Sequence, residues 1–185
     1  FGEGHWDLNE LTINYRNPQE VSDLASRFAQ NEGLYISTVN AVRALPDSVS
    51  RHVVDDMKAL LTVTSNQAAQ LANHFVSADG TGRIAIICPN DLIKPVREAV
   101  RHRLSSLMAP SEYQRLIDQP EWDEQISVCG TEMVKGLEFD AVIVIEPGRI
   151  EDDAPSRLVA ASDLYVATTR PTQKLVIVRT KEDER

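Results

Sequence analysis

The sequence predicts an α/β fold in which helices flank a mostly parallel central sheet. Several segments are short, rich in Val and Ile and apolar almost throughout, which is typical of strands buried on both faces of a parallel sheet. Amphipathic helical patterns alternate with these segments, and strands alternating with helices build βαβ units. The 185 residues and 42% hydrophobic content are enough for one domain with a substantial core.

Five apolar segments are predicted as strands. Four of them are apolar at nearly every position, whereas the third along the chain is shorter and more mixed. The predicted strands cover residues 59–63, 84–88, 126–129, 141–145 and 175–178.

Helices are predicted where apolar residues recur at i, i+3, i+4 and i+7. This spacing occurs over 21–28, 68–75 and 161–168. A longer helix is predicted over 91–108, with Asp91 as its N-cap. Its inward-facing residues are predicted to be Ile93, Val96, Val100, Leu104 and Leu107.

The regular pattern predicts a single domain over 11–180. Residues 1–10 are expected to be a connector from an upstream segment, and 181–185 a frayed end. Segments 31–56 and 109–124 are less regular and are candidate surface excursions. The chain begins with Phe rather than Met, which indicates a piece of a longer protein.

Charge and composition exclude several classes of function. The chain has 28 acidic and 19 basic residues and a formal charge of −9, so it is not expected to coat nucleic acid by bulk electrostatics.

We find no apolar run near the ~20 residues of a membrane span and no secretory signal, and therefore expect a cytoplasmic protein without a membrane partner. Cys88 and Cys129 end apolar runs and are expected to be buried and reduced, and the four scattered His residues predict no metal site.

Three segments combine residue types that suit a nucleotide, although the sequence has no P-loop, no dinucleotide-binding glycine motif and no serine-nucleophile motif. Tyr15 and Arg16 precede a predicted helix, where a ring can stack on a base and a guanidinium can reach phosphate oxygens. Gly136 and Glu138 precede a predicted strand, where a glycine permits close backbone approach. Arg170 ends a predicted helix and could neutralise charge on a transferred phosphoryl group.

Each of these segments also has an ordinary structural explanation. The tyrosine can be a core residue with a surface arginine beside it, and the second segment can be a turn with solvated acids. An arginine at a helix C-terminus interacts favourably with the helix dipole in any protein.

In this order and at these separations, the three segments resemble motifs of superfamily 1 helicases of the UvrD/Rep type. NYR (14–16) is similar to motif IV, KGLEFD (135–140) to motif V, and LYVATTR (164–170) to motif VI. The resemblance covers 11 to about 178. It implies the second RecA-like domain of a motor, with a P-loop domain upstream in the same chain as its partner.

The resemblance implies a role for five residues. Tyr15 is at the position that stacks on adenine, and Arg16 at the position that contacts the γ-phosphate. Gly136 and Glu138 are at the position near the ATP ribose, and Arg170 is at that of the arginine finger. ATP and Mg²⁺ would be held mainly by the P-loop domain, which carries the Mg²⁺ ligands. This chain alone is therefore expected neither to bind ATP tightly nor to hydrolyse it.

Three departures from the family pattern put the single-strand track in doubt. DNA-unwinding members carry a His where this chain has Glu132, and a Thr where it has Gly130. Motif VI usually continues with Ala, whereas Pro171 follows here. The residues expected to face ATP are intact.

Within the family, the chain most resembles the HelD branch of Gram-positive bacteria, in particular the actinobacterial form. AVRALPDSV (41–49), KGLEFDAVIVIEPGRI (135–150) and the short spacer into SDLYVATTR (162–170) carry this resemblance. HelD-like proteins are ATPases associated with RNA polymerase, which implies that polymerase as partner. The acidic charge and Glu132 fit a motor that acts on a protein.

Two alternatives remain open: a DNA-repair helicase of the UvrD/Rep 3'-5' type, with DNA as partner, and a non-catalytic binding module on a motor fold. Lys94, Arg97 and Arg101 share one face of a predicted helix and could contact polymerase or nucleic acid. An ordinary solvated helix face is the other explanation for these cations.

Overall fold

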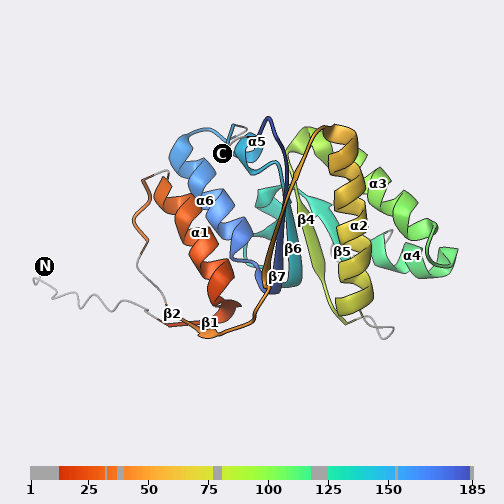
Figure 1. The fold of residues 1–185 in the computed structure, drawn as a ribbon, viewed down its shortest axis with the longest axis horizontal. Coiled ribbons are helices and arrows are strands. Elements are labelled where there is room, and N and C mark those ends of the chain that lie inside the picture. The colour runs from red at the N-terminus through yellow and green to blue at the C-terminus, as the bar shows by residue number, and fades with distance from the viewer. Residues whose placement is uncertain are drawn as a thin grey trace, which may run out of the picture.

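The computed structural model describes six stretches of the chain, residues 13–31, 33–36, 40–76, 81–117, 125–152 and 154–183. Within them, a five-stranded sheet lies between two layers of helices (Figure 1). All its strand pairs are parallel, which confirms the predicted fold class. In spatial order the strands are β3 (Val49–Val54), β7 (Pro171–Thr180), β6 (Phe139–Ile145), β4 (Ile84–Ile87) and β5 (Ile126–Cys129).

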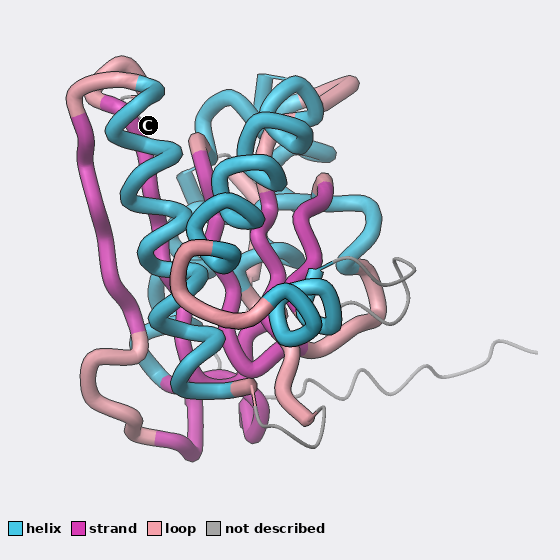
Figure 2. Tube along the Cα trace, turned by 90° about the vertical axis from the view of Figure 1, so that its right-hand side faces the viewer, coloured by secondary structure: helices cyan, strands magenta, loops and turns pink. Residues whose placement is uncertain are grey.

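Helices cover both faces of the sheet. α1 (Gln19–Asn31) and α6 (Arg157–Thr168) cover one face, and α2 (Met57–Phe75) and α3 (Ile93–Ser105) cover the other (Figure 1). When the molecule is turned by 90°, the layer formed by α2 and α3 faces the viewer, with the sheet behind it (Figure 2). Four short helical segments complete the described part of the fold, namely η1 (Asn90–Leu92), α4 (Pro110–Ile117), η2 (Thr131–Val134) and α5 (Pro147–Asp152).

The central strands are apolar at consecutive positions because they are buried on both sides. Ile84 and Ile86 of β4 join the core beneath α2 and α3, whereas Ala85 and Ile87 join the core beneath α1 and α6. All four residues have no exposed surface. This double burial explains why the strands read as continuous apolar runs and not as alternating ones.

A separate two-stranded parallel ribbon lies at the end of the sheet where β6 and β7 begin. It consists of β1 (Ile13–Pro18) and β2 (Asn40–Arg43), with Ile13 opposite Asn40 (Figure 1). β1 leads directly into α1, so the residues expected to bind a nucleotide stand at a strand-to-helix junction.

The strand predicted over 59–63 is wrong, because these residues belong to the first half of α2. The helix predicted over 68–75 is the second half of the same helix. Asp56 caps the start of α2, and its side chain accepts a hydrogen bond from the Ala59 backbone N–H at 2.8 Å. A short apolar run cannot by itself distinguish a buried strand from a buried helical turn.

The helix predicted over 91–108 is shorter in the structure, where α3 begins at Ile93 and ends at Ser105. Asp91 is not its N-cap, because the 3₁₀ turn η1 precedes the helix and places Leu92 at that position. Asp91 instead pairs with Arg149 at 2.6 Å. Leu107 lies beyond the helix end and is 54% exposed, contrary to the prediction that it faces inward.

The surface excursion expected over 31–56 is partly wrong, because it contains the edge strand β3. This strand pairs with β7 from Val49 opposite Leu175 to Val54 opposite Thr180. Its sequence alternates exposed and half-buried residues, since it is an edge strand, and it therefore lacks the apolar run that marked the central strands.

Several predicted segments lie outside the described residues. They are the connector 1–10, the last two residues 184–185, and 118–124 of the second excursion. The earlier part of that excursion forms α4. Within the expected frayed end, Asp183 is buried and accepts a hydrogen bond from the Gly148 N–H.

Candidate functional site

The three predicted nucleotide-binding segments come together at the amino ends of β6 and β7. Arg16 Nε lies 2.7 Å from Glu138 Oε1, so β1 meets the loop before β6. Arg170 Nη1 donates to the Leu137 carbonyl at 3.2 Å, so the end of α6 meets the same loop. We call Tyr15, Arg16, Glu138 and Arg170 the arginine cluster. Their roles toward a nucleotide stay predictions.

A buried asparagine joins β1 to the start of β7. The Asn17 side-chain NH₂ donates to the carbonyls of Thr169 at 2.8 Å and Pro171 at 2.7 Å, on either side of Arg170. Sequence reasoning missed Asn17, whose only local signal is a polar residue between Arg16 and a proline. It is 3% exposed, so this amide fixes Arg16 relative to Arg170 from inside the protein.

The backbone around Arg16 is held by Asn14. The Asn14 Oδ1 atom accepts from the N–H groups of Arg16 at 2.9 Å and Asn17 at 3.1 Å. A side chain that bonds the backbone two and three residues ahead fixes a local turn. Beside this turn, the Tyr15 side chain is 70% exposed, a geometry that suits an aromatic ring for stacking on a ligand.

The loop before β6 turns at Gly136, whose φ is +82°. No heavy atom outside its chain neighbours lies within 4 Å of the place where a Cβ would be. Within this chain, the glycine is therefore required for its left-handed backbone, and its predicted close approach to a ligand stays a prediction. The turn presents Glu138 to Arg16, and both side chains are about half-exposed, at 51% and 45%.

Arg170 is held by carbonyls on both sides. Its Nε donates to the Val166 carbonyl at 3.1 Å, in the last turn of α6, in addition to the Leu137 bond. Burial lowers the pKa of Arg170, and the positive charge of Arg16 lowers it further, whereas the charge of Glu138 opposes this shift. The two guanidinium groups are thus close enough to repel each other, with one carboxylate in the same cluster.

A second ion pair ties the loop to α6. Lys135 Nζ lies 2.9 Å from Asp163 Oδ1, and this pairing raises the pKa of Lys135, to which the charge of Glu132 also contributes. Neither Lys135 nor Asp163 was predicted as a site residue. Both stand in the quoted motifs, but nothing in their spacing indicates that they pair.

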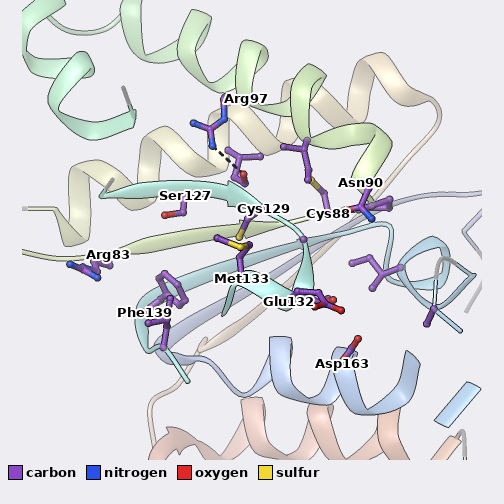
Figure 3. Close-up of a pocket in the computed structure, with 18 of the residues that line it drawn as sticks. Arg83, Cys88, Asn90, Arg97, Ser127, Cys129, Glu132, Met133, Phe139 and Asp163 are labelled. Carbon is purple, nitrogen blue, oxygen red and sulfur yellow. Dashed lines mark hydrogen bonds between the residues drawn. The ribbon is translucent and has the colours of Figure 1, made fainter. Parts of the chain in front are cut away.

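A cavity of about 710 Å³ lies beside the loop, next to β4 and β5 (Figure 3). Glu132, which stands where DNA-unwinding members carry a His, lines it, and its carboxyl group points toward that of Asp163 (Figure 3). Arg97 lines the cavity from α3 and donates to the Val128 carbonyl at 3.3 Å. Lys94 and Arg101 are exposed on α3 and are not among the lining residues, so the predicted basic face is divided.

Cys88 also lines the cavity, but its chemistry is that of a buried thiol. Burial, with smaller contributions from Cys129 and Asp91, raises the pKa of Cys88 to about 12. Both cysteines are free thiols, and Cys129 is only half-buried, which corrects the expectation that both are buried. A thiol with so high a pKa is protonated at neutral pH and is a poor nucleophile or metal ligand.

The donor set of the arginine cluster fits a polyphosphate better than a metal ion. It offers two guanidinium groups and an exposed ring, and the phosphate oxygens of a nucleotide accept hydrogen bonds from such planar donors. Among the described stretches of the chain, no group of three or more His, Cys, Asp or Glu residues is placed to hold a metal. In the same stretches, no helix is long and apolar enough to cross a membrane.

Comparison with known proteins finds solved structures that share this fold, one of which is described here. It is the C-terminal domain of a possible DNA helicase from Lactobacillus plantarum WCFS1, with a TM-score of 0.58 and 19% identity, covering 90% of this chain and 88% of that one. The chain shares the fold of that domain. No protein-family model matches the sequence. No curated protein matches it either. At this identity, the likeness establishes the shared RecA-like fold.

Proposed function

We propose that this chain is the second motor domain of a superfamily 1 helicase-like ATPase. It would complete an ATP site held mainly by a P-loop domain of the same protein. The observation that carries the proposal is the meeting of Arg16 and Arg170, from opposite ends of the chain, beside the exposed ring of Tyr15. Two guanidinium groups that lie near one another repel, and a polyphosphate bound to both would relieve this repulsion.

Each residue of the arginine cluster has a proposed role when the two domains close on ATP. Tyr15 stacks on the adenine, and Glu138 accepts a hydrogen bond from the ribose. Arg16 and Arg170 stabilise the charge that develops on the transferred phosphoryl group. Mg²⁺, bound by the P-loop domain, would neutralise further phosphate charge. Because both domains contact ATP only in the closed state, hydrolysis releases the contacts and reopens the motor.

The cavity supports a more specific proposal, namely that the motor acts on a protein such as RNA polymerase. Glu132 is exposed at the cavity, its carboxyl group points toward that of Asp163, and the chain carries a formal charge of −9. Carboxylates repel the phosphates of a nucleic-acid strand, whereas they suit a basic protein surface. This favours the polymerase-associated motor of the HelD type.

A DNA helicase is the second candidate. It is supported by the solved structure described as the C-terminal domain of a possible DNA helicase, which shares this fold. Arg83 and Arg97 also line the cavity, and these two cations could contact a strand.

The test of the ATPase proposal is Arg170→Ala in the complete protein that contains this chain. We expect ATP turnover to fall by about 10³-fold or more, since arginine fingers contribute that much to phosphoryl transfer. Arg149→Ala is the control, because it also removes a guanidinium group but at the other end of the sheet, where Arg149 pairs with Asp91. A loss of less than about tenfold for Arg170→Ala contradicts the role.

Single-stranded DNA distinguishes the two candidates. ATP turnover of the complete protein is measured with and without the strand. Turnover that does not respond to DNA supports the protein-directed motor, and binding to RNA polymerase is then measured directly. Strong stimulation by DNA contradicts it and favours the helicase.

A further inference from the structure

Arg16 already has an anionic partner within the chain. Its Nε lies 2.7 Å from the Glu138 carboxylate, a length typical of a charge-assisted hydrogen bond. Both side chains are about half-exposed, so neither is locked by packing. The neighbouring residue, Leu137, accepts the hydrogen bond from Arg170, and one short loop therefore serves both arginines.

The carboxylate also balances the charge of the cluster. Arg16 acts on Arg170 as a like charge, and Glu138 acts on it in the opposite sense. Without an anion, two guanidinium groups fixed near one another by Asn17 would repel each other. Carboxylate and phosphate oxygens accept hydrogen bonds from guanidinium N–H groups in the same geometry. Glu138 therefore makes with Arg16 the kind of hydrogen bond that a phosphate would make.

We propose that Glu138 is an internal counter-ion that holds Arg16 when no polyphosphate is present, and that an incoming polyphosphate displaces it. The inference rests on the proposed function, because it assigns a regulation to the same cluster. The exchange weakens polyphosphate binding by the strength of the ion pair that must be broken. It also frees the Glu138 carboxylate for another donor at the moment when Arg16 is taken by phosphate.

A merely structural ion pair predicts something different. If Glu138 only stiffened the loop, its removal would leave the affinity for a polyphosphate unchanged or lower it. If it competes for Arg16, its removal raises that affinity. The sign of the change therefore separates the two explanations.

The experiment measures binding of inorganic tripolyphosphate to this chain by titration calorimetry at low ionic strength. Glu138→Gln keeps the shape of the side chain and removes its charge. We expect it to tighten binding by about two- to fivefold, the equivalent of a typical exposed ion pair. Asp91→Asn is the matched control, since it removes one charge from an exposed Arg–carboxylate pair at the opposite end of the sheet, and it should leave binding unchanged.

Side-chain NMR of the Arg16 Nε–H group provides a second readout. We expect its resonance to shift in Glu138→Gln without ligand, and to move in the wild type as tripolyphosphate is added. Thermal unfolding confirms that each variant is folded.

Four results overturn the inference. Equal tightening by Glu138→Gln and Asp91→Asn would mean that only net charge matters. Unchanged affinity in Glu138→Gln, while Arg16→Gln abolishes binding, would remove the competition but leave the proposed function intact. Binding that neither Arg16→Gln nor Arg170→Gln weakens would remove the inference and the proposed function together. Absence of binding in both the wild type and Glu138→Gln also contradicts the competition.

Discussion

At the scale of single residues, the arginine cluster depends on the buried amide of Asn17. Its two hydrogen bonds reach carbonyls on both sides of Arg170, so one side chain connects segments from the two ends of the chain. Buried carbonyls that lose their donor cannot be satisfied by water. The residue is therefore a positioning residue, because it fixes where the two arginines stand without any need to touch a ligand.

Asn17→Ala should lower the free energy of unfolding by about 1–3 kcal/mol, the cost of leaving buried polar groups unsatisfied. Urea denaturation measures this change. Asn40→Ala is the control, since Asn40 is exposed in β2 and should cost little. Equal costs for the two variants would contradict the structural role of Asn17.

Two glycines differ in what surrounds them. At Gly136, where the sequence predicts close approach to a ligand, no other part of the chain lies near, and that prediction stays open. A close approach within the chain occurs at Gly82, where a Cβ would lie 2.0 Å from the Phe75 carbonyl oxygen. Both glycines have a positive φ. The sequence does not reveal which of them also lies against backbone atoms of another segment.

At the scale of elements, α2 shows how a capping residue distinguishes a helix from a strand. The apolar run 59–63 fits either structure, but Asp56 stands in an extended conformation and satisfies the Ala59 N–H. The neighbouring Asp55 has a different role, since it is exposed and pairs with Lys181. Two adjacent acids are thus a helix cap and a surface ion pair.

We expect Asp56→Ala to lower the free energy of unfolding by about 1 kcal/mol, as is typical of a lost N-cap. Asp55→Ala should leave stability nearly unchanged, because exposed ion pairs contribute little. Parallel urea titrations of the two variants make the comparison. A larger effect at Asp55 than at Asp56 would contradict the assigned helix start.

At the scale of the whole molecule, the end of the chain is held against the end of β6 by buried acids. Glu146 is 2% exposed and accepts hydrogen bonds from the backbone N–H and hydroxyl of Thr180. Asp183 accepts from the Gly148 N–H and lies near enough to Glu146 for their charges to interact. Burial, and then the charge of Glu146, raises the pKa of Asp183 above its usual value of 3.8.

The raised pKa predicts a pH dependence of stability. The folded protein holds the Asp183 proton more tightly than the unfolded chain, so this contribution is complete below the unfolded pKa. It is lost as the pH rises through the folded pKa, so the wild type should lose stability relative to Asp183→Asn. Urea midpoints of both proteins between about pH 3.5 and 7 test this, the usual Asp pKa lying near the lower limit. A difference that does not change with pH would contradict it.

The sequence by itself determined the fold class, four of the five strands of the sheet (β4, β5, β6 and β7) and most of the helices. Continuous apolar runs arise where a strand is buried on both faces. The residue types of the segment alone therefore indicate its burial. The predicted site residues rested on resemblance to motifs. The edge strand β3 was missed because half-exposed residues leave no such run.

Only the tertiary structure decided how the predicted residues meet. It paired Arg16 with Glu138, joined Asn17 to both sides of Arg170, and placed Glu132 beside Asp163 at a cavity shared with Arg97. These contacts follow from the strand order β3-β7-β6-β4-β5, which brings the start of β6 beside the start of β7. Local patterns encode period and burial, but not the order of strands in space, and contacts between distant segments therefore cannot be read from them.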